Sequence, residues 1–241
     1  IYRWVQHADP RLFARIQNYV RKGRWEIVGG WIEQPDCNLP STESFVRQSL
    51  YGKGYFQQEF GIDVRIGYNV DSFGHAAGLP QILAGAGFTH YVFMRPMPWE
   101  KDLPNLFWWE GPDRSRVLTW HLPQNYGQSP NADADHLEAE IRRALRRVRQ
   151  LQADPDLPEL RLSTVSDFFA AVEAEPAFAD IPTLTGELNK HAPGCYAAHA
   201  NIKRDNRRVE RLLVEAELAA TATQLALPAP KAARSLQRNW E

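Results

Sequence analysis

The sequence predicts an α/β fold, because two short β-prone segments enclose a loop and a helix. Residues 64–70 combine β-branched side chains with alternation of apolar and polar positions, which is typical of a strand. Residues 81–86 form a helix that stops at Gly87, and the apolar residues 91–94 form a second strand. Strand, polar loop, helix and strand in this order describe a parallel unit. In such units functional side chains gather where strands end.

Further elements are predicted on both sides of this unit by helical spacing or by runs of β-branched and aromatic residues. Pro10 suits the first turn of a helix and Gly23 ends it. The predicted elements are a helix over 10–22, a strand over 25–28 that ends at Gly29 and Gly30, an irregular loop over 31–40, a helix from Ser41 or Thr42 through Tyr51, a hairpin over 106–122, a helix over 137–151, a strand over 160–163 with a helix over 165–172, and a long helix over 202–227.

The composition changes near residues 191–202, from glycine, proline and aromatic residues to alanine, leucine, glutamate and arginine. Such a shift indicates a domain boundary. We expect a partial α/β catalytic-type domain over 1–190 and the start of a helical domain over 191–241, with a second helix from about Ala232.

Charge and composition exclude several classes of protein. The chain has 28 Lys and Arg against 29 Asp and Glu, a net charge of −1, which argues against a nucleic-acid binder that depends on bulk attraction. With 44% hydrophobic residues it is expected to fold rather than stay disordered.

No apolar run is long enough for a membrane span and no leader is evident, so a cytoplasmic protein is expected. Because residue 1 is not Met, the natural start is expected upstream. Cys37 and Cys195 are predicted to be free thiols.

The basic run over residues 142–149 raises the alternative of nucleic-acid binding. Glu138 and Glu140 precede it, and no aromatic residues lie within it. This pattern is more typical of a solvated helix face.

Asp71 is the first candidate for chemistry, because it directly follows a predicted strand and precedes small residues. A carboxylate there can act as nucleophile, general base or metal ligand, or it can simply cap the next helix. His75, four residues later, could share a metal with it, but a lone pair is a weak signal.

Two further features accompany Asp71. Arg95 follows the neighbouring predicted strand and could pair with Asp71, bind a substrate, or make a structural ion pair. The loop that contains Trp31 and Asp36 mixes an aromatic side chain with hydrogen-bonding groups, a composition that sugar sites use and hydrated surface loops share.

Several ordered segments carry a resemblance to a known family. One of them is the segment Tyr68-Asn69-Val70-Asp71-Ser72-Phe73-Gly74-His75. With the others it resembles glycoside hydrolase family 38, the α-mannosidases, especially the bacterial branch. The other matching segments are residues 23–31, 38–48, 79–83, 186–196 and 203–210.

The resemblance implies a retaining α-mannosidase that acts on mannose-containing oligosaccharides. It implies a seven-stranded, barrel-like α/β catalytic domain, of which the chain is an internal fragment, followed by a three-helix bundle. By the same resemblance Asp71 is the nucleophile and a ligand of one Zn²⁺ ion, and Arg95 supports it. Trp31 and Asp36 are predicted to bind substrate.

Other expected parts of the family pattern have no counterpart here. The early His-x-Asp motif and the last zinc-binding His are absent from the chain, and no Gly-rich acidic segment follows the hairpin. Asp133 and Asp135 are the acids considered for the second carboxyl. Two alternatives stay open: a metal-dependent polysaccharide deacetylase, which predicts His75 as a ligand, and a non-catalytic remnant whose helices assemble a homo-oligomer.

Overall fold

The computed structural model describes residues 1–123, 134–155, 161–189 and 191–226. The chain divides into two compact units, one made of Ile1–Pro123 and Ala179–Glu241 and the other of Gln124–Phe178. The first unit contains a five-stranded sheet within a mixed α/β arrangement, so the predicted α/β class is confirmed.

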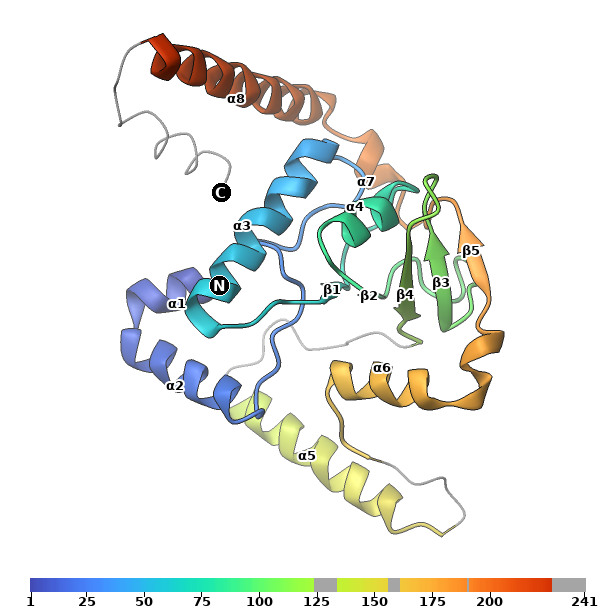
Figure 1. Cartoon of the computed structure of the whole chain (residues 1–241). Coiled ribbons are helices and arrows are strands. Elements are labelled where there is room, and N and C mark those ends of the chain that lie inside the picture. Colours follow the sequence, from blue (N-terminus) through green and yellow to red (C-terminus); the bar gives the residue numbers. More distant parts are fainter. Residues whose placement is uncertain (124–133, 156–160, 190, 227–241) are drawn as a thin grey trace. The chain divides into compact units, whose positions relative to one another are not determined.

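The sheet of the first unit has the strand order β1-β2-β4-β3-β5 (Figure 1). Strands β1, β2 and β4 run parallel, β3 is antiparallel to β4, and β5 is parallel to β3. The bounds are β1 Ile66–Asn69, β2 His90–Phe93, β3 Leu106–Glu110, β4 Arg116–His121 and β5 Thr183–Thr185. The predicted hairpin is therefore β3 and β4, and the predicted parallel unit is β1, α4 and β2.

Helix α4, Leu79–Gly85, joins β1 to β2 and packs against the sheet (Figure 1). Its Leu79 and Leu83 are buried, with Tyr91 and Trp109 of the sheet in the same hydrophobic core. Burial of apolar side chains is the main source of stability of such a core. The packing of α4 on the sheet stabilises the pairing of β1 with β2, so the ends of these two strands lie next to each other.

Three helices precede the sheet. Helix α1 is Tyr2–Ala8, α2 is Pro10–Arg21 and α3 is Thr42–Phe60. Helix α2 begins at Pro10 as predicted, with the Asp9 side chain accepting from the Leu12 N–H. Ser41 caps α3 by accepting from the Ser44 N–H, which decides between the two predicted starts.

The structure differs from the predicted elements at several places. Residues 25–28 form no strand, although the Gly29 N–H donates to Ile66 of β1, because Gly29 and Gly30 take positive φ angles of 92° and 68° that end the ladder at once. Helix α1, the short helix over Gly194–Ala197 and strand β5 are not among the predicted elements. The described part of 160–163 is not a strand.

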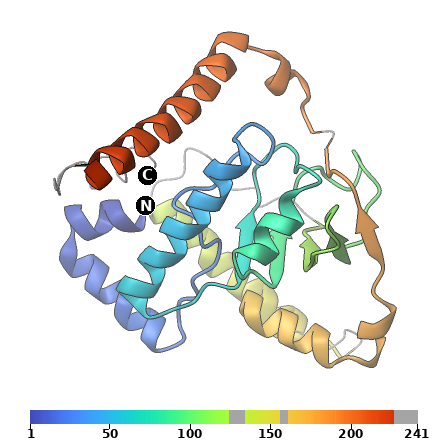
Figure 2. The same ribbon diagram turned by 45° about the horizontal axis from the view of Figure 1, so that its top comes forward.

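Helix α8, Ala200–Ala226, matches the predicted long helix and is joined to the α3 segment by an ion pair and hydrogen bonds (Figure 2). Arg47 of α3 makes two bonds of 2.6 Å to the Glu217 carboxylate, and Glu210 accepts from Ser41 and Ser44. The short α7, Gly194–Ala197, leads into it. Among the described residues, none of the helices is long and apolar enough to cross a membrane.

The second unit contains α5, Ala134–Gln152, and α6, Val165–Ala174, followed by the turn of 3₁₀-helix Pro176–Asp180 at its boundary. Thr164 caps α6 by accepting from the Asp167 N–H. Arg142 of α5 pairs with Glu138 one turn earlier and stays exposed, as predicted for a solvated basic face. The second helix predicted near Ala232 lies outside the described residues.

Candidate active site

Asp71 and Arg95 come together because the strands before them are parallel neighbours. Asp71 lies two residues after β1, and Arg95 lies two residues after β2. The Arg95 Nε donates to the Asp71 Oδ1 at 2.9 Å. The Asp71 side chain is 47% exposed, whereas the Arg95 side chain is only 17% exposed. The carboxylate is thus open to a ligand while its cationic partner is held by the protein.

Two buried histidines hold the backbone on either side of Arg95. His75 Nε2 lies 2.9 Å from the Arg95 carbonyl oxygen. His121 Nε2 lies 3.1 Å from the Met94 carbonyl and 2.8 Å from the Pro96 carbonyl. A carbonyl only accepts, so these nitrogens carry the hydrogens. Three successive carbonyls are therefore fixed by buried donors.

The second nitrogen of His75 is also engaged. Since Nε2 donates, Nδ1 accepts, and the Tyr91 hydroxyl donates to it at 2.9 Å. Burial lowers the pKa of His75 to about 4, so the ring is neutral at neutral pH. The idea that His75 binds a metal is therefore wrong in this structure, because both nitrogens are occupied by protein groups.

Burial of neutral His75 makes stability depend on pH. The pKa of about 4 in the folded chain lies below the ordinary value of 6.5, so the unfolded chain binds the proton first as pH falls. The full contribution is present above about pH 6.5 and is lost as pH falls towards 4. We expect the free energy of unfolding to fall by about 2 kcal/mol between pH 7 and pH 5 from this residue.

His75→Gln should remove that part of the pH dependence. The measurement is denaturant unfolding of the full-length protein and the variant at pH 7 and pH 5. His7→Gln, at an exposed position in α1, is the matched control. An unchanged pH dependence in His75→Gln would show that His75 is not held neutral by burial.

The side chain of Arg95 also contacts a histidine from a segment distant in the sequence, His191. The Arg95 Nη1 donates to His191 Nε2 at 3.1 Å, and His191 Nδ1 lies 2.7 Å from both Glu100 carboxylate oxygens. The Met97 N–H also donates to Glu100 at 2.8 Å. Burial raises the pKa of Glu100, but these hydrogen bonds outweigh burial and leave it below the usual value. No local sequence signal predicts this arrangement.

The residues predicted to bind sugar lie in different surroundings. Trp31 is only 5% exposed, packs edge-on against Phe45 and Phe88, and donates from its indole N–H to Ser49. Its ring is part of the core, although the residue also lines a hollow of about 610 Å³ with Tyr68. A role as an open aromatic platform would require uncovering the ring, so it stays a prediction.

Asp36 is half-buried, and its Oδ1 accepts from the backbone N–H groups of Asn38 and Leu39. This shapes the loop before α3. Its predicted role in substrate binding is compatible with that structural one, because only Oδ1 is used in these two bonds.

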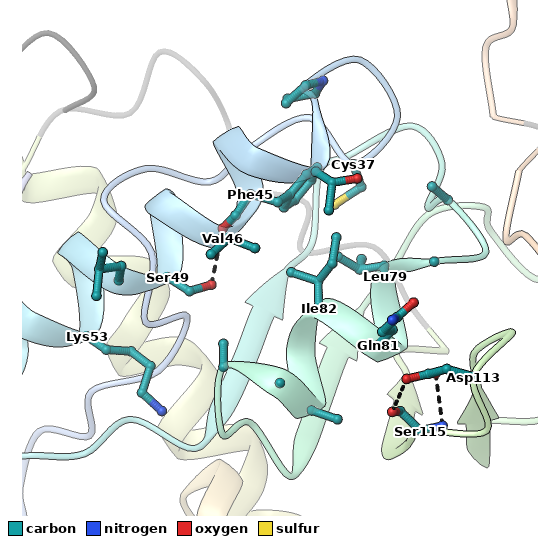
Figure 3. A pocket seen from close by; sticks show the side chains of 18 of the residues that line it. Cys37, Phe45, Val46, Ser49, Lys53, Leu79, Gln81, Ile82, Asp113 and Ser115 are labelled. Carbon is teal, nitrogen blue, oxygen red and sulfur yellow. Dashed lines mark hydrogen bonds between the residues drawn. The ribbon is translucent and has the colours of Figure 1, made fainter. Parts of the chain in front are cut away.

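A larger groove of about 1280 Å³ lies between α3 and α4, away from the Asp71 and Arg95 pair. Figure 3 shows Phe45 and Val46 of α3 across it from Leu79 and Ile82 of α4. Asp71 and Arg95 do not line it. The groove has both apolar and polar lining residues, but the paired Asp71 and Arg95 side chains lie outside it, so we place the candidate active site at Asp71.

The described residues do not form a metal site by themselves. Among them there is no group of three or more His, Cys, Asp or Glu side chains that could hold a metal ion. Asp71 is a suitable single ligand, but a zinc site needs three or four. Cys37, which is buried, and Cys195 are both free, as predicted.

Comparison with known proteins defines the class to which this fold and site belong. Residues 1–142, more than half of the chain, match the glycosyl hydrolases family 38 N-terminal domain. The chain belongs to glycosyl hydrolase family 38.

Individual relatives agree with this assignment. The chain is 34% identical to human alpha-mannosidase 2C1 and 32% identical to alpha-mannosidase G of Dictyostelium discoideum, with 89% and 91% of the chain aligned. It spans only 23% and 22% of those proteins. The fold is similar to that of an alpha-mannosidase from Enterococcus faecalis V583, with a TM-score of 0.58 and 23% identity over 76% of this chain and 24% of that one.

Proposed function

We propose that the full-length protein is a glycosidase that cleaves terminal α-linked mannose from oligosaccharides or glycans. The observation that carries the proposal is the exposed Asp71 carboxylate, paired with Arg95 at the ends of two parallel strands. Membership of family 38 and the α-mannosidases among its relatives support the substrate class.

The proposed mechanism is retaining, with Asp71 as the nucleophile. Its carboxylate attacks the anomeric carbon and forms a covalent glycosyl ester as the leaving oxygen departs. Arg95 fixes the orientation of the carboxylate through Oδ1. A second carboxyl, about 5 Å from the first, protonates the leaving oxygen and then activates water. Asp133 and the side chain of Asp135 lie outside the described residues, so neither is assigned.

Zinc is proposed as the cofactor of the full-length protein, with Asp71 as one ligand. Because the described residues contain no cluster that could hold a metal, the other ligands would have to lie elsewhere. Bound zinc would supply electrostatic stabilisation of hydroxyl groups.

The wider organisation is also a proposal. We propose that residues 1–190 are part of a seven-stranded, barrel-like catalytic domain, and that residues 191–241 are the start of a three-helix bundle. The exposed Ile202 and Leu218 of α8 support further helices packing there, with a homo-oligomer as the alternative. Light scattering on the full-length protein distinguishes them.

The free thiols Cys37 and Cys195 support a reducing, cytoplasmic location.

The activity can be tested directly with aryl α-mannosides and the full-length protein. We expect hydrolysis of the α-mannoside but not of the aryl β-mannoside, with the α-anomer of mannose as the first product by proton NMR. Removal of metal by a chelator should abolish turnover, and added Zn²⁺ should restore it. Initial formation of the β-anomer would contradict the retaining mechanism, and deacetylation of an acetylated polysaccharide without glycosidase activity would favour the alternative.

A further inference from the structure

Arg95 can support Asp71 only if its guanidinium is held in place, and two segments of the first unit contribute to holding it. The Asp71 loop supplies Phe73, whose ring centroid lies 5.5 Å from the Arg95 guanidinium carbon. The segment after β5 supplies His191, which accepts from the Arg95 Nη1 at 3.1 Å. Arg95 and His191 are 96 positions apart, so their contact depends on the tertiary fold.

His191 is itself fixed on three sides. Its Nε2 accepts from Arg95, so the hydrogen is on Nδ1, which donates to Glu100 at 2.7 Å. Its ring packs edge-on against Phe73 at a centroid distance of 4.7 Å. Glu100 is held in turn by the Met97 N–H. The side chains of His191 and Glu100 are only 19% and 22% exposed, so solvent competes little with these bonds.

We propose that His191 and Glu100 are positioning residues that orient Arg95 toward the Asp71 nucleophile. The four side chains form one chain of contacts, from Glu100 through His191 and Arg95 to Asp71, with separations between 2.7 and 3.1 Å. This inference rests on the proposed function, because it assigns the pair a role in setting up nucleophilic attack. Neither residue is assigned contact with the substrate.

The test compares two substitutions of His191 in the full-length protein. His191→Phe keeps a ring against Phe73 but loses both hydrogen bonds. His191→Gln keeps an acceptor for Arg95 and a donor for Glu100. We expect His191→Phe to lower kcat for an aryl α-mannoside by about 10- to 100-fold with little change in KM. We expect His191→Gln to keep kcat much closer to the wild-type value.

Glu100→Gln provides a second variant that leaves the aromatic packing intact. It keeps an oxygen acceptor for His191 without the charge, and we expect a smaller loss in kcat than for His191→Phe. Wild-type kcat in both His191→Phe and Glu100→Gln would overturn the proposal. Equal losses in His191→Phe and His191→Gln would also overturn it, because the role would then not be hydrogen bonding.

Crystal structures of the wild-type protein and His191→Phe provide a readout that does not depend on activity. We expect the Arg95 guanidinium to move away from Asp71 in the variant, and an unmoved Arg95 would overturn the proposal. If the wild-type protein hydrolyses no aryl α-mannoside, the proposed function fails, while this structural comparison still decides whether His191 positions Arg95.

Discussion

Asp71→Asn in the full-length protein is expected to lower kcat for an aryl α-mannoside by about 10³-fold or more. The amide has nearly the shape of the carboxylate and keeps an oxygen that can accept from Arg95 Nε. It lacks the negative charge and the nucleophilicity needed to form a glycosyl ester. Because the side chain is 47% exposed, loss of activity should come without loss of the fold.

Asp113→Asn is the matched control for this experiment. Asp113 is an exposed turn residue between β3 and β4 that accepts from the Ser115 N–H and hydroxyl. The substitution makes the same change in charge and keeps a side-chain oxygen that can accept from the Ser115 N–H, so activity should stay near wild type. Circular dichroism of both variants checks the fold. If Asp71→Asn keeps more than about a tenth of wild-type kcat, Asp71 is not the nucleophile.

The contact between Asp71 and Arg95 could be anticipated because it follows from local patterns. β-branched runs identified the two strands, and the helix between them implied parallel pairing. Residues that follow parallel neighbours must then lie near each other. The same argument could not predict which way a side chain points. The metal-binding hypothesis for His75 was wrong because the side chain is buried and bonded to the Tyr91 hydroxyl.

Contacts between distant segments left no signal that a single sequence could show. Glu100 and His191 are separated by 91 positions, and neither lies in a periodic pattern that points to the other. Strand β5 has only three residues, two of them exposed, so it carries no alternation to recognise. Its pairing with β3 depends on a partner more than 70 positions earlier in the chain. The sequence likewise places Trp31 in a loop, because the aromatic residues that bury it come from other segments: Phe45 on α3, Phe88 just before β2 and Tyr91 within β2.

Gly52 is a position where a small substitution should have a large effect on stability. It lies in α3, where an alanine would normally favour the helix by up to about 1 kcal/mol. A Cβ atom there would lie 2.4 Å from the Gly30 carbonyl oxygen and 2.5 to 2.6 Å from backbone atoms of Trp31. These are backbone atoms, which cannot move aside by changing a rotamer. Helix α3 packs this closely on the segment that leads to Trp31 only because residue 52 has no side chain.

We therefore expect Gly52→Ala to destabilise the domain by about 3 kcal/mol or more, since the overpacking exceeds the gain in helix propensity. Gly54→Ala, two positions later in the same helix, is the control, because a Cβ there meets nothing within 4 Å. It should raise stability by about 0.5 to 1 kcal/mol. Thermal unfolding of both variants of the full-length protein measures the difference. A Gly52→Ala variant as stable as Gly54→Ala would show that α3 does not pack on the Gly30–Trp31 backbone at this distance, and that the loop bearing Trp31 is held to α3 by other contacts.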